Sequence, residues 1–271
     1  MKASIKSLIR DLIPRKIQVP VKYWYSYFNG MLEPEINFLK LIIPTNGYAI
    51  DIGGNRGVYS YKLNLLRLKV ETFEPNLHCF KILNAWARNN RNITVHQIAL
   101  SNSSGAANLH IPVDDSGVEH DSSATIENIE FDNQTNQSVV METLDHFQFQ
   151  RVDFIKVDVE GHESTLLDGA EATLKRCKPS ILIEIEQRHN DEDISKIFSK
   201  ITNHGYKGYF LRNNTIYDIN EFNIELYQSM SEFGNLGLYI NNFFFLNKDR
   251  IQNGEYDQFI SLIDNRQLSK I

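Results

Sequence analysis

The chain has 271 residues, of which 42% are hydrophobic and 11% aromatic, with a formal net charge of −6 and two cysteines. The length allows one large α/β domain or two small ones, and the composition is that of a folded chain rather than a disordered one. Two cysteines exclude a disulfide framework, so a reducing compartment is expected. The acidic balance argues against nucleic acid as the main partner, because binding phosphates requires a clustered basic surface.

Residues 1–46 are predicted to form an N-terminal extension that covers the sheet or the mouth of the active site. Within it, residues 1–13 place apolar side chains at helical spacing with Lys and Arg between them, a pattern typical of an amphipathic helix rather than of a signal peptide or membrane span. We expect this helix to pack on the domain or on a second subunit, with a membrane surface as the alternative. Residues 23–28 are mostly aromatic and could stack on a sugar, but core packing is the favoured role. A helix is expected over residues 33–41.

The stretch from Tyr48 to Gly57 is an apolar run that ends in an acid and then in glycines. This pattern predicts a buried parallel strand over 47–53 that enters a ligand-binding turn, since glycine lets the backbone turn sharply and lets a ligand approach. The helix predicted over 57–68 would aim its free N–H groups at the turn.

The glycine spacing separates two classes of cofactor. A dinucleotide fingerprint requires glycines at the first, third and sixth positions, but the third and sixth are Asn55 and Val58. Asp51, at the end of the strand, places a fixed negative charge beside the turn. This charge suits a ligand with a cationic amine, such as S-adenosylmethionine.

Strands then alternate with helices, which predicts right-handed crossovers and a mostly parallel sheet with its ligands at the carboxyl ends of the strands. Strands are expected over 69–74 and 93–100, with a helix over 76–90 that Asn76 caps. Glu74 ends the second strand, at the position where a carboxylate can accept both hydroxyls of a ribose.

Residues 101–145 break this alternation. A strand is expected near 107–113, followed by a polar stretch over 114–135, and regular structure restarts at 139. We interpret this part of the chain as an insertion with a mobile loop, where contacts specific to the substrate are common.

A second informative stretch runs from Val152 to Glu163. A buried strand is predicted over 154–159, followed by one helix that carries apolar side chains from Leu166 to Leu174. While the chain stays extended, Lys156, Asp158 and Glu160 share one face, which is costly for charged groups unless they pair or act chemically. The alternative is an ion pair of Lys156 with Asp158 that caps the next helix.

The remaining elements complete the domain. A fifth strand is predicted over 180–186, a helix over 191–203, a hairpin over 206–217 and a last strand over 236–246. Residues 247–271 are expected to form a helical tail after the domain of residues 47–246.

Several stretches of the sequence resemble the FkbM-type S-adenosylmethionine-dependent methyltransferases. They are Asp51 to Gly57 with Tyr59 and Ser60, Phe73 to Asn76, Asn89 and Asn90, Ala99 to Ser101, Ile155 to Glu163, and Leu167 to Ala170. The resemblance covers about residues 47–187. Gly54 departs from it, because alanine is commoner there, and a glycine is expected to loosen the turn without removing a contact.

The resemblance implies a Rossmann-like, seven-stranded class I methyltransferase fold, with one antiparallel strand in a mostly parallel sheet and helices on both faces. It implies methyl transfer to an oxygen, often a hydroxyl of a sugar, a cell-surface glycan or a secondary metabolite. It assigns the cofactor's methionine end to Asp51, Gly53, Asn55 and Gly57, its ribose to Glu74 and its adenine to Ala99 or neighbouring residues.

A sugar hydroxyl is a poor nucleophile, so a base or a metal must take its proton. We expect Asp158 or Glu160 to do this, with His162 as the next choice. No metal site is assigned, although acids spaced as Asp158, Glu160 and Glu184 could bind Mg²⁺ through oxygen.

The expected partner is a small-molecule or glycan acceptor, with no nucleic acid and no integral membrane segment. A cytoplasmic location is expected, and a homo-oligomer is left open. Two other functions are open: an NAD-dependent oxidoreductase, which the glycine spacing disfavours, and a non-catalytic module that keeps the cofactor fold as a binding surface.

Overall fold

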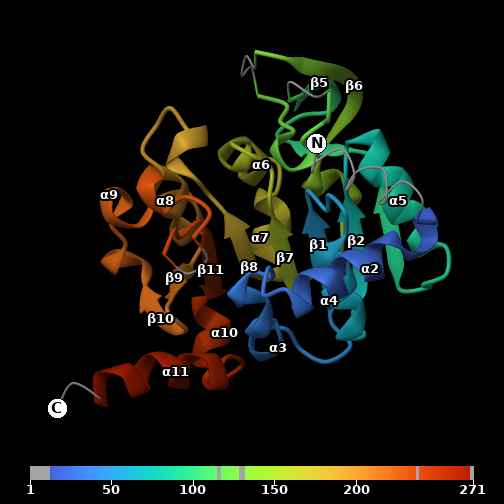
Figure 1. The fold of residues 1–271 in the computed structure, drawn as a ribbon. Helices are drawn as coiled ribbons and strands as arrows, with labels where there is room; N and C mark the ends of the chain where they lie inside the picture. The colour runs from blue at the N-terminus through green and yellow to red at the C-terminus, as the bar shows by residue number, and fades with distance from the viewer. Residues whose placement is uncertain (1–12, 115–116, 128–131, 236–237, 269–271) are drawn as a thin grey trace.

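The computed structural model of the chain describes residues 13–114, 117–127, 132–235 and 238–268. Its centre is an eight-stranded sheet with the strand order β10-β9-β11-β8-β7-β1-β2-β3 (Figure 1). The strands are β1 (Tyr48–Ile52), β2 (Lys69–Phe73), β3 (Ile93–His96), β7 (Phe154–Val157), β8 (Ser180–Glu184), β9 (Tyr206–Arg212), β10 (Thr215–Asp218) and β11 (Asn242–Asn247). Five neighbouring strands, in the spatial order β8-β7-β1-β2-β3, pair in parallel. Strand β11 runs antiparallel to both β8 and β9.

This arrangement confirms the predicted fold class, a mostly parallel sheet of the class I methyltransferase type. The sheet has one strand more than the seven predicted, because β10 forms a hairpin with β9 and adds an eighth strand at the edge. Asn213 and Asn214 both have positive φ, which matches the two-residue turn expected between these strands.

Helices cover both faces of the sheet, and alternate strand residues pack against each layer. Ala49 and Phe154 face a core shared with α2 (Arg15–Phe28), α3 (Leu39–Ile42), α4 (Val58–Leu65), α5 (Leu77–Ala87) and α11 (Asp257–Leu268). Ile50 and Ile155 face the other core, shared with α6 (Glu163–Asp168), α7 (Glu171–Cys177) and α8 (Ser195–Asn203). Strands buried on both faces explain the near-continuous apolar runs in the sequence.

A second sheet rises above the carboxyl ends of the main strands (Figure 1). It has three strands in the order β4-β6-β5, formed by Ala99–Ser101, Gln134–Thr143 and Gly105–Pro112. The prediction of one strand over 93–100 is therefore wrong. His96 is the last residue that pairs with β2, and the chain then leaves the main sheet and pairs with β6 from Ala99.

Two predicted helices are also divided in the structure. The helix after Gly161 breaks into α6 and α7, where Gly169 passes so close to β4 that a Cβ would lie 1.9 Å from the Ser101 carbonyl oxygen. Residues 33–41 form a short 3-10 turn, Pro34–Asn37, before α3. Within the described residues, the tail contains two helices, α10 (Lys248–Gln252) and α11.

The N-terminal extension packs on the domain through α2, which lies against α4 and α5. Val19, Tyr23 and Ser26 are its buried residues. The expectation that residues 23–28 pack in the core is wrong for most of them, because only one side of α2 faces the domain. Trp24, Tyr25, Tyr27 and Phe28 remain exposed. The amphipathic helix expected over residues 1–13 lies almost wholly outside the described residues.

Among the described helices, none combines the length and the apolar character needed to cross a membrane.

Candidate active site

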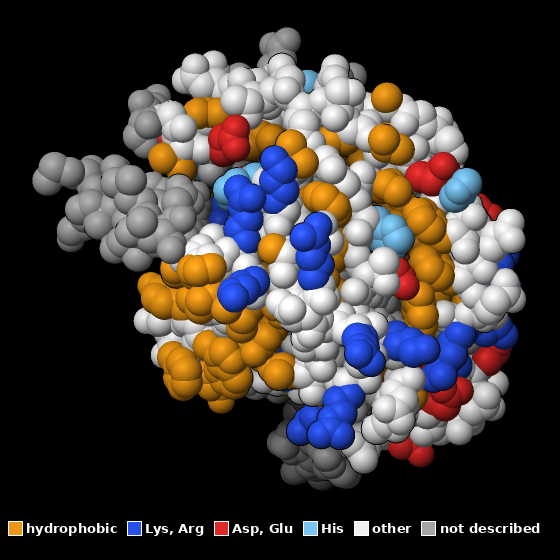
Figure 2. Space-filling view, turned by 90° about the vertical axis from the view of Figure 1, so that its right-hand side faces the viewer, with side chains coloured by type: hydrophobic (Ala, Val, Ile, Leu, Met, Phe, Trp, Pro, Cys, Tyr) orange, Lys and Arg blue, Asp and Glu red, His pale blue; other side chains and the backbone are white. Residues whose placement is uncertain are grey.

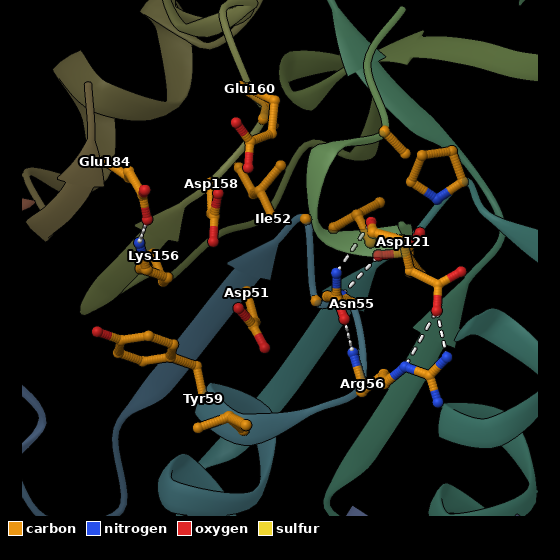
Figure 3. Close-up of a pocket in the computed structure, with 18 of the residues that line it drawn as sticks. Asp51, Ile52, Asn55, Arg56, Tyr59, Asp121, Lys156, Asp158, Glu160 and Glu184 are labelled. Carbon is orange, nitrogen blue, oxygen red and sulfur yellow. Dashed lines mark hydrogen bonds and ion pairs between the residues drawn. The ribbon is translucent and has the colours of Figure 1, made fainter. Parts of the chain in front are cut away.

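A cavity of about 420 Å³ lies at the carboxyl ends of β1, β2, β7 and β8 (Figure 3). This volume is within the usual range for small-molecule pockets. The turn after β1, the ends of β2 and β7, the start of β4, the insertion and the segment after α2 all contribute to its wall. Parallel strands end at one edge of a sheet, which explains how distant parts of the chain meet here.

The glycine turn has the backbone geometry that the sequence predicted. Gly53 and Gly57 have φ of +76° and +79°, a region that favours glycine. A Cβ on Gly53 would lie 1.7 Å from the Asp158 carbonyl oxygen, so the turn after β1 packs directly against the end of β7. Gly57 does not line the cavity. A Cβ there would lie 2.7 Å from Leu83 Cδ2, and its role in the structure is to pack α4 against α5.

Gly54 is more constrained than the sequence indicated. A Cβ at this position would lie 2.3 Å from Thr72 Cγ2. The expectation that glycine merely loosens the turn is therefore wrong, because in this chain the methyl group of Thr72 occupies the space that an alanine would need.

Asp51 lines the cavity and is almost fully buried, with 1% of its surface exposed. Ser60 on α4 donates a hydrogen bond from Oγ to Asp51 Oδ2 over 2.5 Å, and Ser60 Oγ lies 2.7 Å from Thr72 Oγ1. Burial raises the pKa of Asp51, while the Ser60 hydroxyl and the Lys156 ammonium oppose the rise.

Glu74 lies next to the glycine turn at the end of β2. Its two carboxylate oxygens accept the backbone N–H groups of Asn55 and Asn76 over 2.6 and 2.7 Å. Burial raises the pKa of Glu74 to about 7, and these two hydrogen bonds oppose the rise. Asn76 caps α5 as predicted, because its Oδ1 accepts from the backbone N–H of His78. Ala99, at the start of β4, also lines the cavity.

The insertion reaches the glycine turn through Asp121, which sequence reasoning missed. Arg56 forms an ion pair with the Asp121 carboxylate, and Asn55 donates from Nδ2 to the Asp121 carbonyl oxygen over 3.1 Å. Further along the insertion, Thr125 donates from Oγ1 to the Glu160 carbonyl oxygen over 2.9 Å. The segment from Asp121 to Thr125 therefore bridges the two sides of the cavity. Asp121 lies in a polar stretch without periodicity, so no local signal identified it.

Lys156 is fully buried at the floor of the cavity (Figure 3). Its Nζ donates to Asn242 Oδ1 over 3.1 Å and lies 4.0 Å from Glu184 Oε2 and 5.0 Å from the centre of the Tyr59 ring. Glu184, rather than Asp158, is thus the carboxylate within ion-pair distance.

Asp158 follows β7 and lines the cavity, and no described residue donates a hydrogen bond to its carboxylate. Burial raises the pKa of Asp158 to about 8, Lys156 opposes the rise, and Glu160 adds to it. Burial also raises the pKa of Glu184 well above its ordinary value, and Asp158 contributes to this shift.

Glu160 and His162 line the same cavity, but other groups engage their side chains. The extended chain ends at Val157 and Glu160 has a φ of +49°, so the shared face predicted for residues 156–160 does not extend to Glu160. Glu160 Oε2 lies 3.0 Å from Nδ1 of His189. The two ring nitrogens of His162 lie 2.9 Å from Ser101 Oγ and 2.5 Å from Glu127 Oε1.

Among the described residues, three potential metal-ligand atoms lie within 4.8 Å of one another at Glu160, Glu186 and His189. This group differs from the predicted set of Asp158, Glu160 and Glu184. Arg188 donates two hydrogen bonds to Glu186, over 2.6 and 3.0 Å, which already neutralises that carboxylate.

The N-terminal extension also contributes charged groups to the cavity that sequence reasoning did not identify, one from α2 and one from the segment that follows it. Glu33 lines the cavity and accepts a hydrogen bond from the Tyr59 hydroxyl. Lys22 lines it too, and burial lowers its pKa, with a further contribution from Arg56.

Acids outnumber bases in the wall of the cavity. The acids are Glu33, Asp51, Glu74, Asp121, Asp158, Glu160 and Glu184, and the bases, leaving His162 aside, are Lys22, Arg56 and Lys156. With seven carboxyl groups against three cations, the cavity suits a positively charged ligand rather than a pyrophosphate, because a bound cation would favour the ionised form of the buried acids whose pKa is raised.

The family model of the methyltransferase FkbM domain matches residues 51–207. No curated protein matches the chain in sequence. Among solved structures, methyltransferase FkbM from Methylobacillus flagellatus KT is similar, with 14% identity and a TM-score of 0.51 over 86% of this chain and 55% of that one. This chain therefore spans about half the length of that protein. A precorrin-6y C5,15-methyltransferase from Geobacter metallireducens GS-15 matches with 11% identity and a TM-score of 0.41 over 79% and 85% of the two chains.

Proposed function

Since the chain belongs to the FkbM family of S-adenosylmethionine-dependent methyltransferases, we propose that it transfers the methyl group to a hydroxyl oxygen of a sugar, a cell-surface glycan or a secondary metabolite. The observation that carries this proposal is the excess of carboxylates in the cavity at the ends of β1, β2, β7 and β8. A cofactor with a sulfonium and an ammonium group matches that field. When bound, the cofactor supplies the electrophilic methyl group.

The residues around the glycine turn fit such a cofactor. Asp51 provides a buried negative charge at the end of β1, and Gly53 keeps the turn free of a side chain. Each oxygen of Glu74 accepts one backbone N–H and retains a second lone pair, so the carboxylate can still accept two ribose hydroxyls. Ala99 and the apolar residues beside it, including Leu109 and Ile126, offer a surface for a flat base.

Asp158 is our choice for the general base. Its carboxylate receives no hydrogen bond from the described residues, and its raised pKa lies near neutral pH, where a base is most effective. Glu160 and His162 have partners of their own, so we assign them to positioning the turn after β7. Asp158 would accept the proton of the acceptor hydroxyl as that oxygen takes the methyl group. The bond from the methyl carbon to sulfur would break in the same step and leave a neutral thioether. Lys156 would limit the rise of the Asp158 pKa.

The test is methyl transfer from radiolabelled S-adenosylmethionine to a cell-envelope extract, followed by fractionation of the label. Asp158→Asn should lower turnover by about 10²–10⁴, the usual contribution of a general base. Asp168→Asn, which removes the exposed carboxylate paired with Lys200, is the matched control and should keep wild-type turnover. Calorimetry with S-adenosylmethionine should show that both variants still bind the cofactor.

If Asp158→Asn retained wild-type turnover, the assignment of the base would be wrong. If the native chain bound the cofactor but labelled no fraction of the extract or of a sugar panel, the non-catalytic binding module would be the better description.

A further inference from the structure

The outer side of α2 carries an unusual concentration of exposed apolar side chains. Among them are Val21, Trp24, Tyr25, Tyr27 and Phe28, followed by Met31; Phe28 is 77% exposed and Met31 58%. Figure 2 shows hydrophobic side chains gathered over this part of the surface, with Lys and Arg side chains beside them. We name the side chains from Val21 to Phe28 on this side of the helix, with Met31, the α2 aromatic face.

Three rings of this face, those of Trp24, Tyr27 and Phe28, are packed on one another before any partner arrives. Trp24 stacks on Phe28 with a centroid distance of 5.8 Å and meets the edge of Tyr27 at 5.5 Å. Trp24 also donates from its indole nitrogen to the Tyr61 hydroxyl over 3.2 Å, which ties the cluster to α4. The aromatic face is therefore a preformed surface, and its rings would lose little conformational freedom on binding.

The sequence that contains the aromatic face is rich in positive charge. Residues 1–32 contain the cations Lys2, Lys6, Arg10, Arg15, Lys16 and Lys22 against one acid, Asp11, a net charge of +5 in a chain whose total is −6. Lys62 lies on the neighbouring α4, one residue after Tyr61, whose hydroxyl accepts the hydrogen bond from Trp24. Burial and, to a smaller extent, the charge of Lys40 lower the pKa of Lys62. Arg15, Lys16, Lys40 and Lys62 form no ion pair within the described part of the chain.

We propose that the α2 aromatic face docks on an anionic lipid surface. Trp and Tyr side chains favour the boundary between water and the bilayer interior, where the ring is apolar and its polar edge stays hydrated. Clustered Lys and Arg side chains add attraction to acidic headgroups. The basic, amphipathic sequence of residues 1–13 precedes α2 directly, so its pattern continues the same preference.

The position of this face connects it to the site. Ser26 belongs to α2, and Met31 and Leu32 follow it in the chain. All three residues line the cavity. A chain docked through α2 would hold the cavity next to the membrane, within reach of acceptors that the membrane carries. This inference concerns the surface alone and is independent of which hydroxyl is methylated.

The test measures binding of the full chain to vesicles of equal parts phosphatidylcholine and phosphatidylglycerol. Because the chain has only two tryptophans and Trp86 is buried, Trp86→Phe leaves Trp24 as the one fluorescent reporter. Its emission should shift to shorter wavelength with these vesicles, and brominated lipid should quench it. Vesicles of phosphatidylcholine alone, or added salt, should weaken binding.

A surface variant gives the matched comparison. Phe28→Ser combined with Tyr25→Ser should weaken vesicle binding about tenfold, equivalent to about 1.4 kcal/mol. Leu226→Ser combined with Met230→Ser removes side chains of similar exposure, 57% and 62%, from α9 (Ile224–Tyr227) and the 3-10 turn after it, and should leave binding unchanged. In Figure 1, α9 lies well away from α2. Thermal unfolding of both variants checks that the fold is intact.

Failure of the full chain to bind the anionic vesicles would overturn the proposal, whatever the outcome of the methyl-transfer assay. Equal binding by the two double variants would overturn it as well. Loss of self-association in the Tyr25 and Phe28 variant, without vesicle binding by the native chain, would instead identify this face as an interface between two copies.

Discussion

The backbone N–H of Asn55 donates to Glu74 Oε2 over 2.6 Å, which ties the glycine turn after β1 to the end of β2. The two residues follow different strands, and their contact fixes the carboxylate at the wall of the cavity before a ligand binds. A site whose groups are already in place loses less freedom on binding, so this contact should contribute to cofactor affinity.

Glu74→Gln tests that contribution. A glutamine has one carbonyl oxygen, so it cannot accept both backbone N–H groups and two ribose hydroxyls as well. We expect the dissociation constant for S-adenosylmethionine to rise tenfold or more, about 1.4 kcal/mol, as measured by calorimetry. Glu142→Gln, at the surface of the small sheet, is the control. An unchanged affinity in Glu74→Gln would remove this residue from the cofactor site.

The bridge formed by the insertion should also matter for affinity. Asp121→Ala removes the ion pair with Arg56, so the segment that closes the cavity loses its main contact with the glycine turn. We expect weaker cofactor binding and faster hydrogen exchange at Thr125 and its neighbours. Glu171→Ala, which breaks the exposed pair with Lys175, should change neither quantity. Equal exchange rates in Asp121→Ala and the native chain would contradict the bridging role.

The pH dependence of kcat/KM should report the titration of Asp158 in the free enzyme. The base acts only when it has lost its proton, so the rate should fall as the pH drops below its pKa of about 8 and level off above it. Lys156→Met removes a cation that lowers this pKa, so the acidic limb of the pH profile, where the rate falls, should move to higher pH. Lys200→Met is the control, because Lys200 pairs with the distant Asp168. A limb that stayed in place in Lys156→Met would argue against Asp158 as the titrating group.

Gly54 and Thr72 form a pair that a double-mutant cycle can test. Gly54→Ala should destabilise the fold by about 1–3 kcal/mol, because its Cβ would collide with Thr72 Cγ2. Thr72→Ser removes that methyl group and keeps the hydroxyl that contacts Ser60. The double variant should therefore lose less stability than the sum of the single variants in denaturant unfolding. Strict additivity would mean that the two positions do not interact.

The sequence predicted the parts of the site that depend on local pattern. Asp51, Gly53, Asn55 and Glu74 stand at strand ends and turns, where a change from apolar run to glycine or acid is visible in the chain itself. The structure brings all four to one cavity, with Ala99, Asp158, Glu160 and His162. The family match supports methyltransferase chemistry over the nicotinamide-dependent alternative.

The features of the fold and the site that the sequence did not predict depend on tertiary contacts, which leave no local pattern in the chain. Asp121 reaches Arg56 across 65 positions of the chain, from a polar stretch without periodicity. The division of residues 93–100 between two sheets follows from the pairing of β4 with β6, and β6 lies beyond the irregular part of the insertion. The exclusion of alanine at Gly54 depends on one methyl group of Thr72 on the neighbouring strand. Such constraints become visible only when the strands are placed side by side.

Calorimetric titration of the native chain with S-adenosylmethionine and, in parallel, with NADH tests the central claim that this acid-rich cavity holds a cationic nucleoside. The account predicts saturable heat with S-adenosylmethionine that Asp51→Asn and Glu74→Gln both weaken, and none with NADH. Absence of heat with S-adenosylmethionine, or binding that is indifferent to both substitutions, would contradict it.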